Sequence, residues 1–392
     1  MRQFLALGGV FISCFLQAQT PKDSISQNPQ YQMNTAQRLL SGNYASAVTV
    51  GSYSEMIYSQ PEGGNGELNV ERMVLLFGYR FNEKAQFVTE LEVEDVHEVE
   101  LEQVFVNYNL ANNVNLRGGL MLVPMGIINE YHEPTTFNGT LRPAVDNLIV
   151  PTTWRELGVG VTGRFNSLSL GYQAYVFNGF KSAAPDGEGG ISGYLTGSGA
   201  LRAGRQNGIE STIDSPTFAT KLDYYGFPGL RLGLATYMGK TQVEDVLEMV
   251  EGSRIGIAMF GLDARYAYKQ LTARGEYIYA TLSDTEAYNA LTGNDLGSAL
   301  QGWYLELAYN LLPARNRQML FAFTRYERYD THAGTAGGLV KNEGYNRTDI
   351  SMGLTYHLAP GVVLKGDYQF RDNGLEGSEV PNLLNFGIGV WF

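Results

Sequence analysis

Residues 385–392 read NFGIGVWF, and large apolar side chains occupy every second position: Phe386, Ile388, Val390 and Phe392. Strict alternation is typical of a β-strand with two different faces, because successive side chains point to opposite sides of the strand. We expect this apolar set to face one environment and Asn385, Gly387 and Gly389 to face another. The remaining sequence indicates what these two environments are.

The composition favours a β-protein. Among 392 residues there are 47 glycines and 25 tyrosines, aromatic residues make up 12%, and charged residues only 17%. Aromatic-rich, charge-poor chains with alternating segments suit sheets better than helices. The net charge of −12 argues against a nucleic-acid partner, because neutralising phosphates requires a basic surface.

The first 18 residues predict a secretory signal peptide, in which a short apolar run ends at the small residue Ala18. A lipoprotein cleavage site around Cys14 is the weaker alternative. Cys14 is the single cysteine of the chain, so the exported protein contains no disulfide. Residues 19–43 are polar and predict a loose periplasmic leader, and residues 44–392 form the folded part.

From Tyr44 onward, alternating segments are separated by turn signals. The stretch MLFAFTRYERY (319–329) changes its apolar parity partway, which favours a bulge. Tyrosines near strand ends, such as Tyr53 and Tyr58, favour interfacial girdles, although simple β-propensity also explains them. About sixteen strands are predicted, at 44–58, 69–81, 84–95, 100–110, 114–123, 153–165, 167–179, 216–225, 229–239, 255–269, 270–283, 300–311, 317–330, 345–358, 361–371 and 380–392.

The connections between these segments alternate between long and short, which predicts an up-and-down antiparallel sheet with all long loops at one end. A sheet of this size needs closure, because free edges expose unpaired backbone groups. A barrel of about sixteen strands is too wide for its own side chains to fill. The charged half of each strand should therefore face a wet lumen, and the apolar half should face lipid. The sequence predicts an all-β transmembrane barrel in the outer membrane.

The segment "VPMGIINEYHEPTTFNGTLRPAVDNLIVPTTWRELGVGVTGRF" (123–165) follows the fifth predicted strand. This segment resembles the phosphate-selective porin O and P family, particularly its Bacteroidota members. The residues that carry the resemblance are "GGL" before it, Pro124, Gly126, Glu130, His132, Arg142-Pro143, Pro151 and "TWRELGVGVTG". The resemblance implies a trimeric barrel of 16 strands in which this loop folds inward and narrows the pore. The aromatic end at Phe392 similarly resembles the signal read by the barrel-assembly machinery.

The composition of this loop agrees with an inward position. Its prolines stiffen it, and residues such as Leu148, Ile149 and Val150 are too apolar for an exposed loop. We expect a constriction loop at about 124–152, and a lid or a trimer latch is the alternative. The predicted constriction residues are Glu130, His132, Glu133, Arg142, Asp146 and Arg155.

The predicted lumen wall is mixed in charge. Basic candidates are Arg72, Arg80, Arg164, Lys221, Arg231, Arg265, Arg274, Lys365 and Arg371. Acidic candidates include Glu90, Glu92, Glu94, Glu156, Asp223, Asp263, Glu276, Glu306, Asp349 and Asp367. The run of basic residues that phosphate selectivity requires is not found, so weak selectivity is expected. The row Glu90-Glu92-Glu94 could hold a divalent cation, but a solvated lumen face is preferred. No metal site and no cofactor are therefore predicted.

These observations favour a porin for passive diffusion of small hydrophilic solutes or ions. A docking or structural barrel with a loop-closed lumen is the alternative. An enzyme is not expected, because none of the four histidines lies in a catalytic or metal-ligand motif: His97, His132, His332 and His357. His357 is expected to be structural, and His97 and His332 to be loop residues. The predicted partners are outer-membrane lipid, the barrel-assembly machinery, small solutes and two further copies in a homotrimer.

Overall fold

Sixteen strands form one closed barrel in the computed structural model, which describes residues 28–41, 47–313 and 316–392. The predicted signal peptide lies outside these residues. The barrel strands are β1 (Val48–Pro61), β2 (Glu67–Arg80), β3 (Ala85–Glu94), β4 (Glu98–Ala111), β5 (Val114–Leu122), β6 (Arg155–Phe165), β7 (Leu170–Phe177), β10 (Thr217–Tyr224), β11 (Leu230–Lys240), β12 (Gly256–Tyr268), β13 (Leu271–Ser283), β14 (Ala299–Asn310), β15 (Met319–Gly334), β16 (Asn346–Ala359), β17 (Val362–Asn373) and β18 (Leu383–Trp391).

The remaining elements are not part of the barrel wall. They are the helices α2 (Thr35–Ser41) and α3 (Thr285–Thr292), the hairpin β8 (Ala183–Pro185) and β9 (Ile191–Gly193), and the short turns η1 (Val145–Ile149), η2 (Asn166–Leu168), η3 (Arg202–Gly204), η4 (Asp245–Leu247) and η5 (Glu343–Tyr345). Among the described residues, no helix is both long and apolar enough to cross a membrane.

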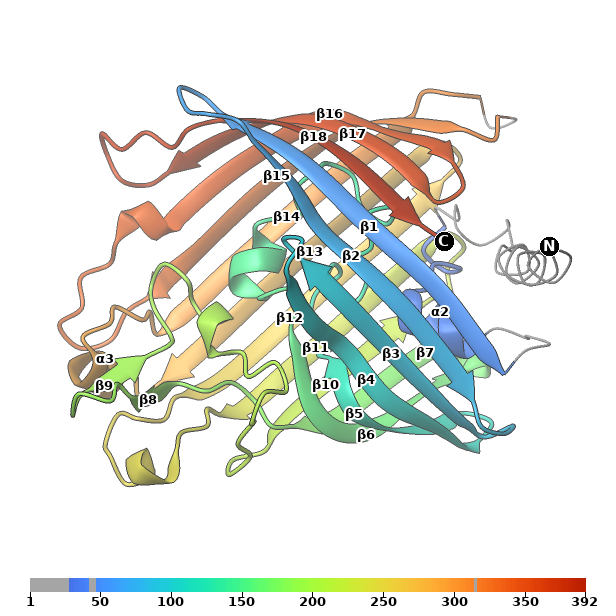
Figure 1. Ribbon diagram of the computed structural model, residues 1–392. Helices are drawn as coiled ribbons and strands as arrows, with labels where there is room; N and C mark the ends of the chain where they lie inside the picture. Colours follow the sequence, from blue (N-terminus) through green and yellow to red (C-terminus); the bar gives the residue numbers. More distant parts are fainter. Residues whose placement is uncertain (1–27, 42–46, 314–315) are drawn as a thin grey trace, which may run out of the picture.

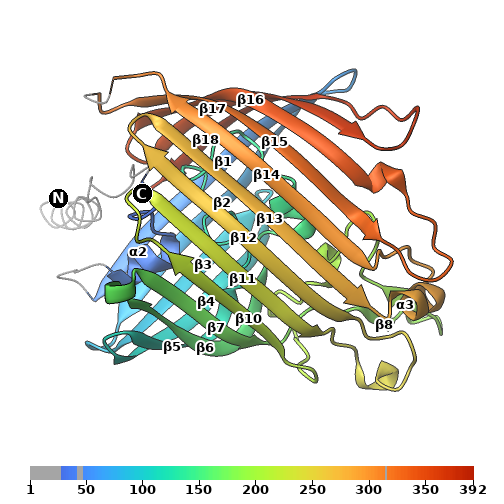
Figure 2. The ribbon, with the colours of Figure 1, turned by 180° about the vertical axis from the view of Figure 1, so that it is seen from behind.

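Each barrel strand pairs antiparallel with its neighbours in the chain, and β18 pairs with β1 to close the sheet. The predicted up-and-down barrel is confirmed. Figures 1 and 2 show the tilted strands, with the long loops at one end and the short turns, α2 and the C-terminus at the other. One connection at the long-loop end is short: the turn at residues 95–97, between β3 and β4.

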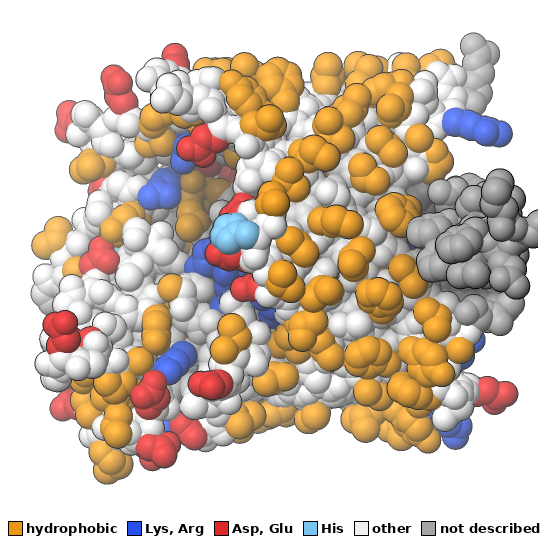
Figure 3. Space-filling model, in the orientation of Figure 1, with side chains coloured by type: hydrophobic (Ala, Val, Ile, Leu, Met, Phe, Trp, Pro, Cys, Tyr) orange, Lys and Arg blue, Asp and Glu red, His pale blue; other side chains and the backbone are white. Residues whose placement is uncertain are grey.

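The two faces of the wall differ as the alternation predicts. Outward side chains include Phe77, Leu262 and Leu305, each exposed, whereas the inward positions of the same strands carry charged groups such as Asp263 and Glu306 that are buried. Figure 3 shows the apolar side chains dense over the wall in the right half of the view, with most charged side chains in the left half and a few at the right edge. This division is the one that a lipid-facing barrel requires.

The closing strand follows the same rule. Phe386, Ile388 and Phe392 are exposed on the outer face, whereas Asn385 is fully buried inside. The backbone N–H of Phe392 donates to the carbonyl of Ser52 on β1 at 2.9 Å. The terminal alternation is therefore the ordinary two-faced pattern of a wall strand.

Three local expectations are wrong. First, β15 has no bulge in residues 321–330, because its pairing with β14 runs without a break from Phe321 to Asp330. Second, Tyr53 is not in a girdle but points into the lumen and is fully buried. Third, His332 is fully buried near the end of β15, where its ring contacts the carbonyl of Asp295 at 2.6 Å.

The predicted leader is not loose over residues 28–41, which we call the leader segment. Gln30 donates to the carbonyls of Tyr225 and Phe227 at 2.7 and 2.8 Å, in the turn between β10 and β11. On the other side, α2 contacts β2 and β3, and the guanidinium of Arg38 lies 4.0 Å from the centre of the Trp391 ring. The leader segment therefore reaches across the turn end of the barrel.

Candidate functional site

Residues 123–154, which we call the inward loop, connect β5 to β6 and lie inside the barrel (Figure 1). Asn129 joins the two ends of the loop. Its side-chain amide donates to the carbonyls of Val123 and Trp154 at 2.7 and 3.1 Å, and its side-chain oxygen accepts from the Trp154 N–H at 2.7 Å. This clamp fixes the direction in which the loop enters the lumen.

Small residues on the wall make room for the loop. Gly302 on β14 faces Val145 and Ile149, and a Cβ atom there would lie 3.0 Å from the Ile149 side chain. Within the loop, Gly126 has a φ of +77°, and a Cβ there would lie 2.7 Å from the Asp146 carboxylate. Glycine is required at Gly126 for both reasons.

Charged side chains of β10 to β13 hold one side of the loop. Lys221 is fully buried, and its Nζ lies 2.5 Å from Glu130 Oε2 and 3.6 Å from Asp263 Oδ2. Glu276 accepts from the Ile127 N–H at 2.5 Å. These contacts satisfy backbone groups that the loop could not pair by itself.

The strands β14, β15 and β17 hold the middle of the loop. Their carboxylates accept hydrogen bonds from loop N–H groups: Asn138 Nδ2 to Glu306 at 2.9 Å, Thr140 N to Asp367 at 2.6 Å and Ala144 N to Glu327 at 2.6 Å. Arg325 donates back to the carbonyls of Asn138 and Leu141. The acidic side chains of the wall therefore do two things: they line the lumen, and they accept hydrogen bonds from the loop.

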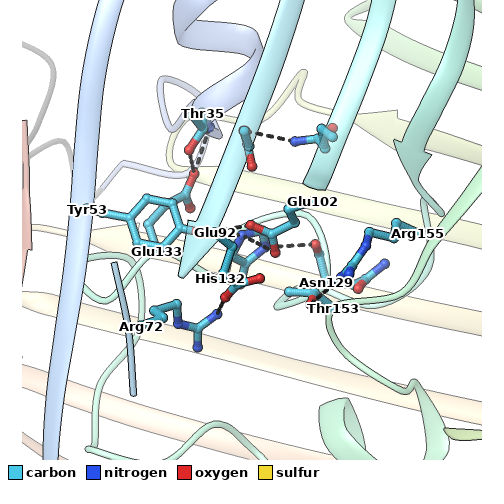
Figure 4. Close-up of polar contacts among 12 residues, drawn as sticks. Thr35, Tyr53, Arg72, Glu92, Glu102, Asn129, His132, Glu133, Thr153 and Arg155 are labelled. Carbon is cyan, nitrogen blue, oxygen red and sulfur yellow. Dashed lines mark hydrogen bonds and ion pairs between the residues drawn. The ribbon is translucent and has the colours of Figure 1, made fainter. Parts of the chain in front are cut away.

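On the opposite wall, His132 contacts β1 and β4. His132 Nε2 lies 2.9 Å from Tyr53 Oη and 3.2 Å from Glu102 Oε1, and the Tyr53 hydroxyl donates to Glu102 Oε2 at 2.8 Å (Figure 4). Burial alone lowers the pKa of His132, but the Glu102 carboxylate raises it, and the net change is upward.

Glu133 links the inward loop to the leader segment. Its carboxylate accepts from the backbone N–H of Thr35 at 2.7 Å and from the Thr35 hydroxyl (Figure 4). Arg155, at the start of β6, forms an ion pair with Glu100 of β4. The loop, the leader segment and the wall of β3 and β4 therefore meet at one place.

The six predicted constriction residues all lie within the barrel or at the loop end of its wall, and five are buried: Glu130, His132, Glu133, Asp146 and Arg155. Arg142 is half-buried. The five buried side chains contact the wall, the leader segment or the loop itself, whereas Nε and Nη2 of Arg142 have no hydrogen-bond partner among the described residues. Burial raises the pKa of Asp146 to about 7, while the Ile128 N–H that donates to it at 3.3 Å acts in the opposite direction. Whether the six residues set ion passage stays a prediction.

Many predicted lining residues on the inner wall form ion pairs. Arg72 lies 3.2 Å from Glu55 and 3.7 Å from Glu92, and Arg274 lies 2.7 Å from Glu306. Further pairs and contacts are Arg231 with Asp223 at 2.9 Å, Arg265 with Asp263 at 3.7 Å, and Glu156 with the Trp154 indole at 2.8 Å.

The remaining predicted lining residues differ in exposure. Lys365 is buried, and its Nζ lies 3.6 Å from the centre of the Phe137 ring. Glu90 is fully buried, and Glu94 and Arg80 are half-buried. Arg164 is exposed near the turn end, with its guanidinium 5.9 Å from the Tyr225 ring.

A polar cavity of about 60 Å³ lies between the leader segment and the wall of β5 to β11. Gln30, Asn34 and Gln37 line it from the leader, and Arg117, Gln173 and Arg231 line it from the wall. Glu130 of the inward loop also borders this cavity. The cavity therefore borders both the leader segment and the inward loop.

Sequence reasoning missed three partners of the loop: Tyr53, Glu102 and Thr35. The alternation of Glu98, Glu100 and Glu102 on β4 was available as a signal for an acidic inner face. The contact of Thr35 with Glu133 joins residues 98 positions apart, and local patterns do not encode it.

Solved structures share this fold at low sequence identity. An anion-selective porin from Comamonas acidovorans matches 88% of this chain and 99% of its own with a TM-score of 0.56 and 14% identity. OmpF of Salmonella typhi matches 88% of this chain and 97% of its own with a TM-score of 0.55 and 11% identity. A loop-deletion mutant of OmpT, an outer membrane protein of Vibrio cholerae, matches 88% and 100% with a TM-score of 0.56 and 11% identity. The fold is a porin-type barrel of sixteen strands.

No protein-family model matches the chain. An uncharacterized protein of Aquifex aeolicus (strain VF5) is 34% identical over 346 residues, which cover 83% of this chain and 76% of that protein. The chain belongs to the same family as this Aquifex protein.

Proposed function

We propose that the protein is an outer-membrane porin through which small hydrophilic solutes or ions diffuse passively. The observation that carries the proposal is the closed sixteen-stranded wall with apolar residues outside and charged residues inside. A barrel of this size encloses more space than its own side chains fill. In this proposal, the polar cavity beside the leader segment forms part of the water-filled path for solutes.

The charges of the inner wall favour weak selectivity. Strands β3 and β4 contain Glu90, Glu92, Glu94, Glu100 and Glu102, and no lysine or arginine. Across the lumen, the cations of β10 to β13 lie beside acids. Rings of one charge sign set the favoured ion, and paired charges largely cancel. The resemblance to phosphate-selective porins therefore does not extend to a proposal of phosphate specificity.

The proposal includes the assembly implied by that resemblance. The barrel would be inserted by the barrel-assembly machinery, with Phe386, Ile388, Val390 and Phe392 as the signal, and would form a homotrimer. The inward loop, with Glu130 and Arg142 among its charged residues, would form the constriction.

A docking barrel with a closed lumen is the second candidate. It is favoured by the contacts of the inward loop with opposite walls and by the leader segment at the turn end. In such a barrel the long loops would serve as the binding surface.

Single-channel recording in a planar bilayer separates the two candidates. A porin gives discrete current steps, and the reversal potential in a salt gradient gives its ion preference, with sugars and phosphate added as competitors. Replacing Arg142 by Gln should shift the reversal potential if the loop constricts the path. A correctly folded protein that gives no current steps contradicts the porin and supports the docking barrel.

A further inference from the structure

Three buried side chains from separate elements bring metal-binding atoms together inside the barrel. Glu90 of β3, Glu102 of β4 and His132 of the inward loop each offer one donor atom, and these atoms lie within 4.8 Å of one another. Glu90 and Glu102 are fully buried, and His132 is 1% exposed. Figure 4 shows Glu102 and His132 directed toward each other beside Tyr53.

A bulge in β4 places Glu102 in this cluster. Glu90 is paired with Gln103 and Leu91 with Leu101, so Glu102 is an extra residue between two paired positions. Both Glu102 and Gln103 consequently point into the lumen, and both are buried. Bulges re-aim side chains in this way and are frequent beside functional sites.

The imidazole of His132 is oriented as metal ligands usually are. Its Nδ1 lies 3.2 Å from the carbonyl of Asn129, which can only accept, so Nδ1 carries the proton. The other nitrogen, Nε2, faces Glu102 Oε1 at 3.2 Å and Tyr53 Oη at 2.9 Å. Nε2 therefore carries either a proton or a metal ion at this position.

Some carboxylate oxygens at the cluster lack donors. Within the described part of the chain, Glu90 Oε2 and Glu133 Oε2, from the residue after His132, accept no hydrogen bond, whereas Glu102 Oε1 faces His132 Nε2 at 3.2 Å. Gln103 donates only to Glu90 Oε1, at 2.9 Å. A buried carboxylate oxygen without a donor or a cation is strongly unfavourable.

The nearby arginines do not balance this charge. Arg72 is already shared by Glu55 and Glu92. Arg155 is paired with Glu100. Within the described part of the chain, no arginine therefore forms an ion pair with Glu90, Glu102 or Glu133, and a divalent cation would neutralise part of their negative charge.

We infer that Glu90, Glu102 and His132 bind a divalent transition-metal ion, such as Zn²⁺ or Mn²⁺, inside the barrel. Mixed carboxylate and imidazole donors suit these ions, whereas Ca²⁺ takes six to eight oxygen ligands. Metal–donor distances of about 2.0–2.2 Å require a small contraction of the cluster, which side-chain rotation supplies. The ion would fasten the inward loop to β3 and β4. This inference does not depend on whether the barrel conducts.

Metal binding is tested on the folded full-length barrel in detergent after removal of metals with a chelator. Titration calorimetry with Zn²⁺ should give one saturable site per chain, with the stoichiometry checked by elemental analysis after dialysis. Glu102→Gln and His132→Gln should each weaken Zn²⁺ binding at least about tenfold, the lower end of the range for altered metal sites. Ca²⁺ should not compete at equal concentration.

Glu98→Gln is the matched control, because Glu98 is an exposed acid of β4, the strand of Glu102, and lies outside the cluster. It should bind Zn²⁺ as the wild type does. Heat-dependent gel mobility reports whether each variant is folded. If Glu102→Gln and His132→Gln do not fold, pulsed paramagnetic resonance of Mn²⁺ on the wild type decides, since an imidazole ligand gives nitrogen modulation. The inference is overturned by absent saturable binding, by unchanged affinity in both folded variants or by absent nitrogen modulation.

Discussion

Lys221 of β10 contacts three acceptors, two on the inward loop and one on the wall strand β12. Its Nζ contacts Glu130, Asp263 and the carbonyl of Gly126, and the side chain is fully buried. Removing one partner of a buried ion pair leaves an uncompensated charge, which costs far more than the pair itself contributes.

Lys221→Met should therefore lower the free energy of unfolding by about 3–5 kcal/mol. Urea unfolding in lipid vesicles, followed by tryptophan fluorescence, measures this change. Lys84→Met is the control, because Lys84 is exposed in the turn between β2 and β3 and should have little effect. Equal effects of the two substitutions would mean that Lys221 is hydrated and does not anchor the loop.

Asp146 gives the loop a dependence on pH. Its pKa is raised from an ordinary value of 3.8 to about 7 by burial, so the folded protein favours the protonated carboxyl. An acid with a raised pKa stabilises the folded state fully at low pH, and this stabilisation is lost as the pH rises from about 4 through 7. The inward loop should accordingly be held more firmly at pH 5 than at pH 8.

Hydrogen exchange of the amides in residues 123–154, corrected for intrinsic rates, measures this difference. Asp146→Asn should flatten the pH dependence, because the amide stays neutral throughout. An unchanged slope in the variant would assign the titration to another group.

Sequence reasoning located the loop residues better than their partners. The prolines and apolar residues of 124–152 predicted an inward loop, and the charged residues Glu130, His132 and Glu133 are inside the barrel. What they contact depends on strand register and on the Glu102 bulge, neither of which a single sequence shows. Tyr53 was misplaced because a tyrosine near a strand end fits a girdle and a buried contact equally well.

Among the elements, the sixteen wall strands were predictable because each has its own period-2 pattern. The failure at β15 has a physical cause. Phe321 and Phe323 face inward beneath the loop, with Phe323 close to Gly139, so apolar residues on the inner face mimic a change of parity. The folding of the leader segment was not predictable, because its polar side chains bind carbonyl groups of a distant turn.

The leader segment gives a prediction at this scale, which rests on the proposed function. Deleting residues 28–41 should raise the single-channel conductance, because these residues border the polar cavity at the turn end. Tyr31→Ala is a control, since Tyr31 is 69% exposed and the loss of its ring should leave the conductance unchanged. A deletion variant that folds and conducts as the wild type does would show that the path avoids the leader segment.

At the scale of the whole molecule, the alternating sequence pattern predicted that apolar side chains lie outside the barrel and charged side chains inside. The pattern did not predict how the lumen is filled. The inner face also carries apolar residues such as Val74, Phe105 and Ile278, which belong to a core shared with the inward loop. A wall pattern alone does not reveal such a core, because the loop supplies the other half of the packing.

The final prediction concerns the cost of placing arginine on the outer face of the barrel. Leu262 lies in the middle of β12 and is 47% exposed on the outside, whereas Tyr268 ends the same strand and is 56% exposed. In a bilayer, arginine at the midplane of a barrel costs about 2–4 kcal/mol and near the interface about 0–1 kcal/mol. Leu262→Arg should therefore lower the free energy of unfolding in lipid vesicles much more than Tyr268→Arg does. In detergent the difference should shrink, because micelles deform around a charge. Equal costs in vesicles would mean that hydrocarbon does not cover the centre of this wall.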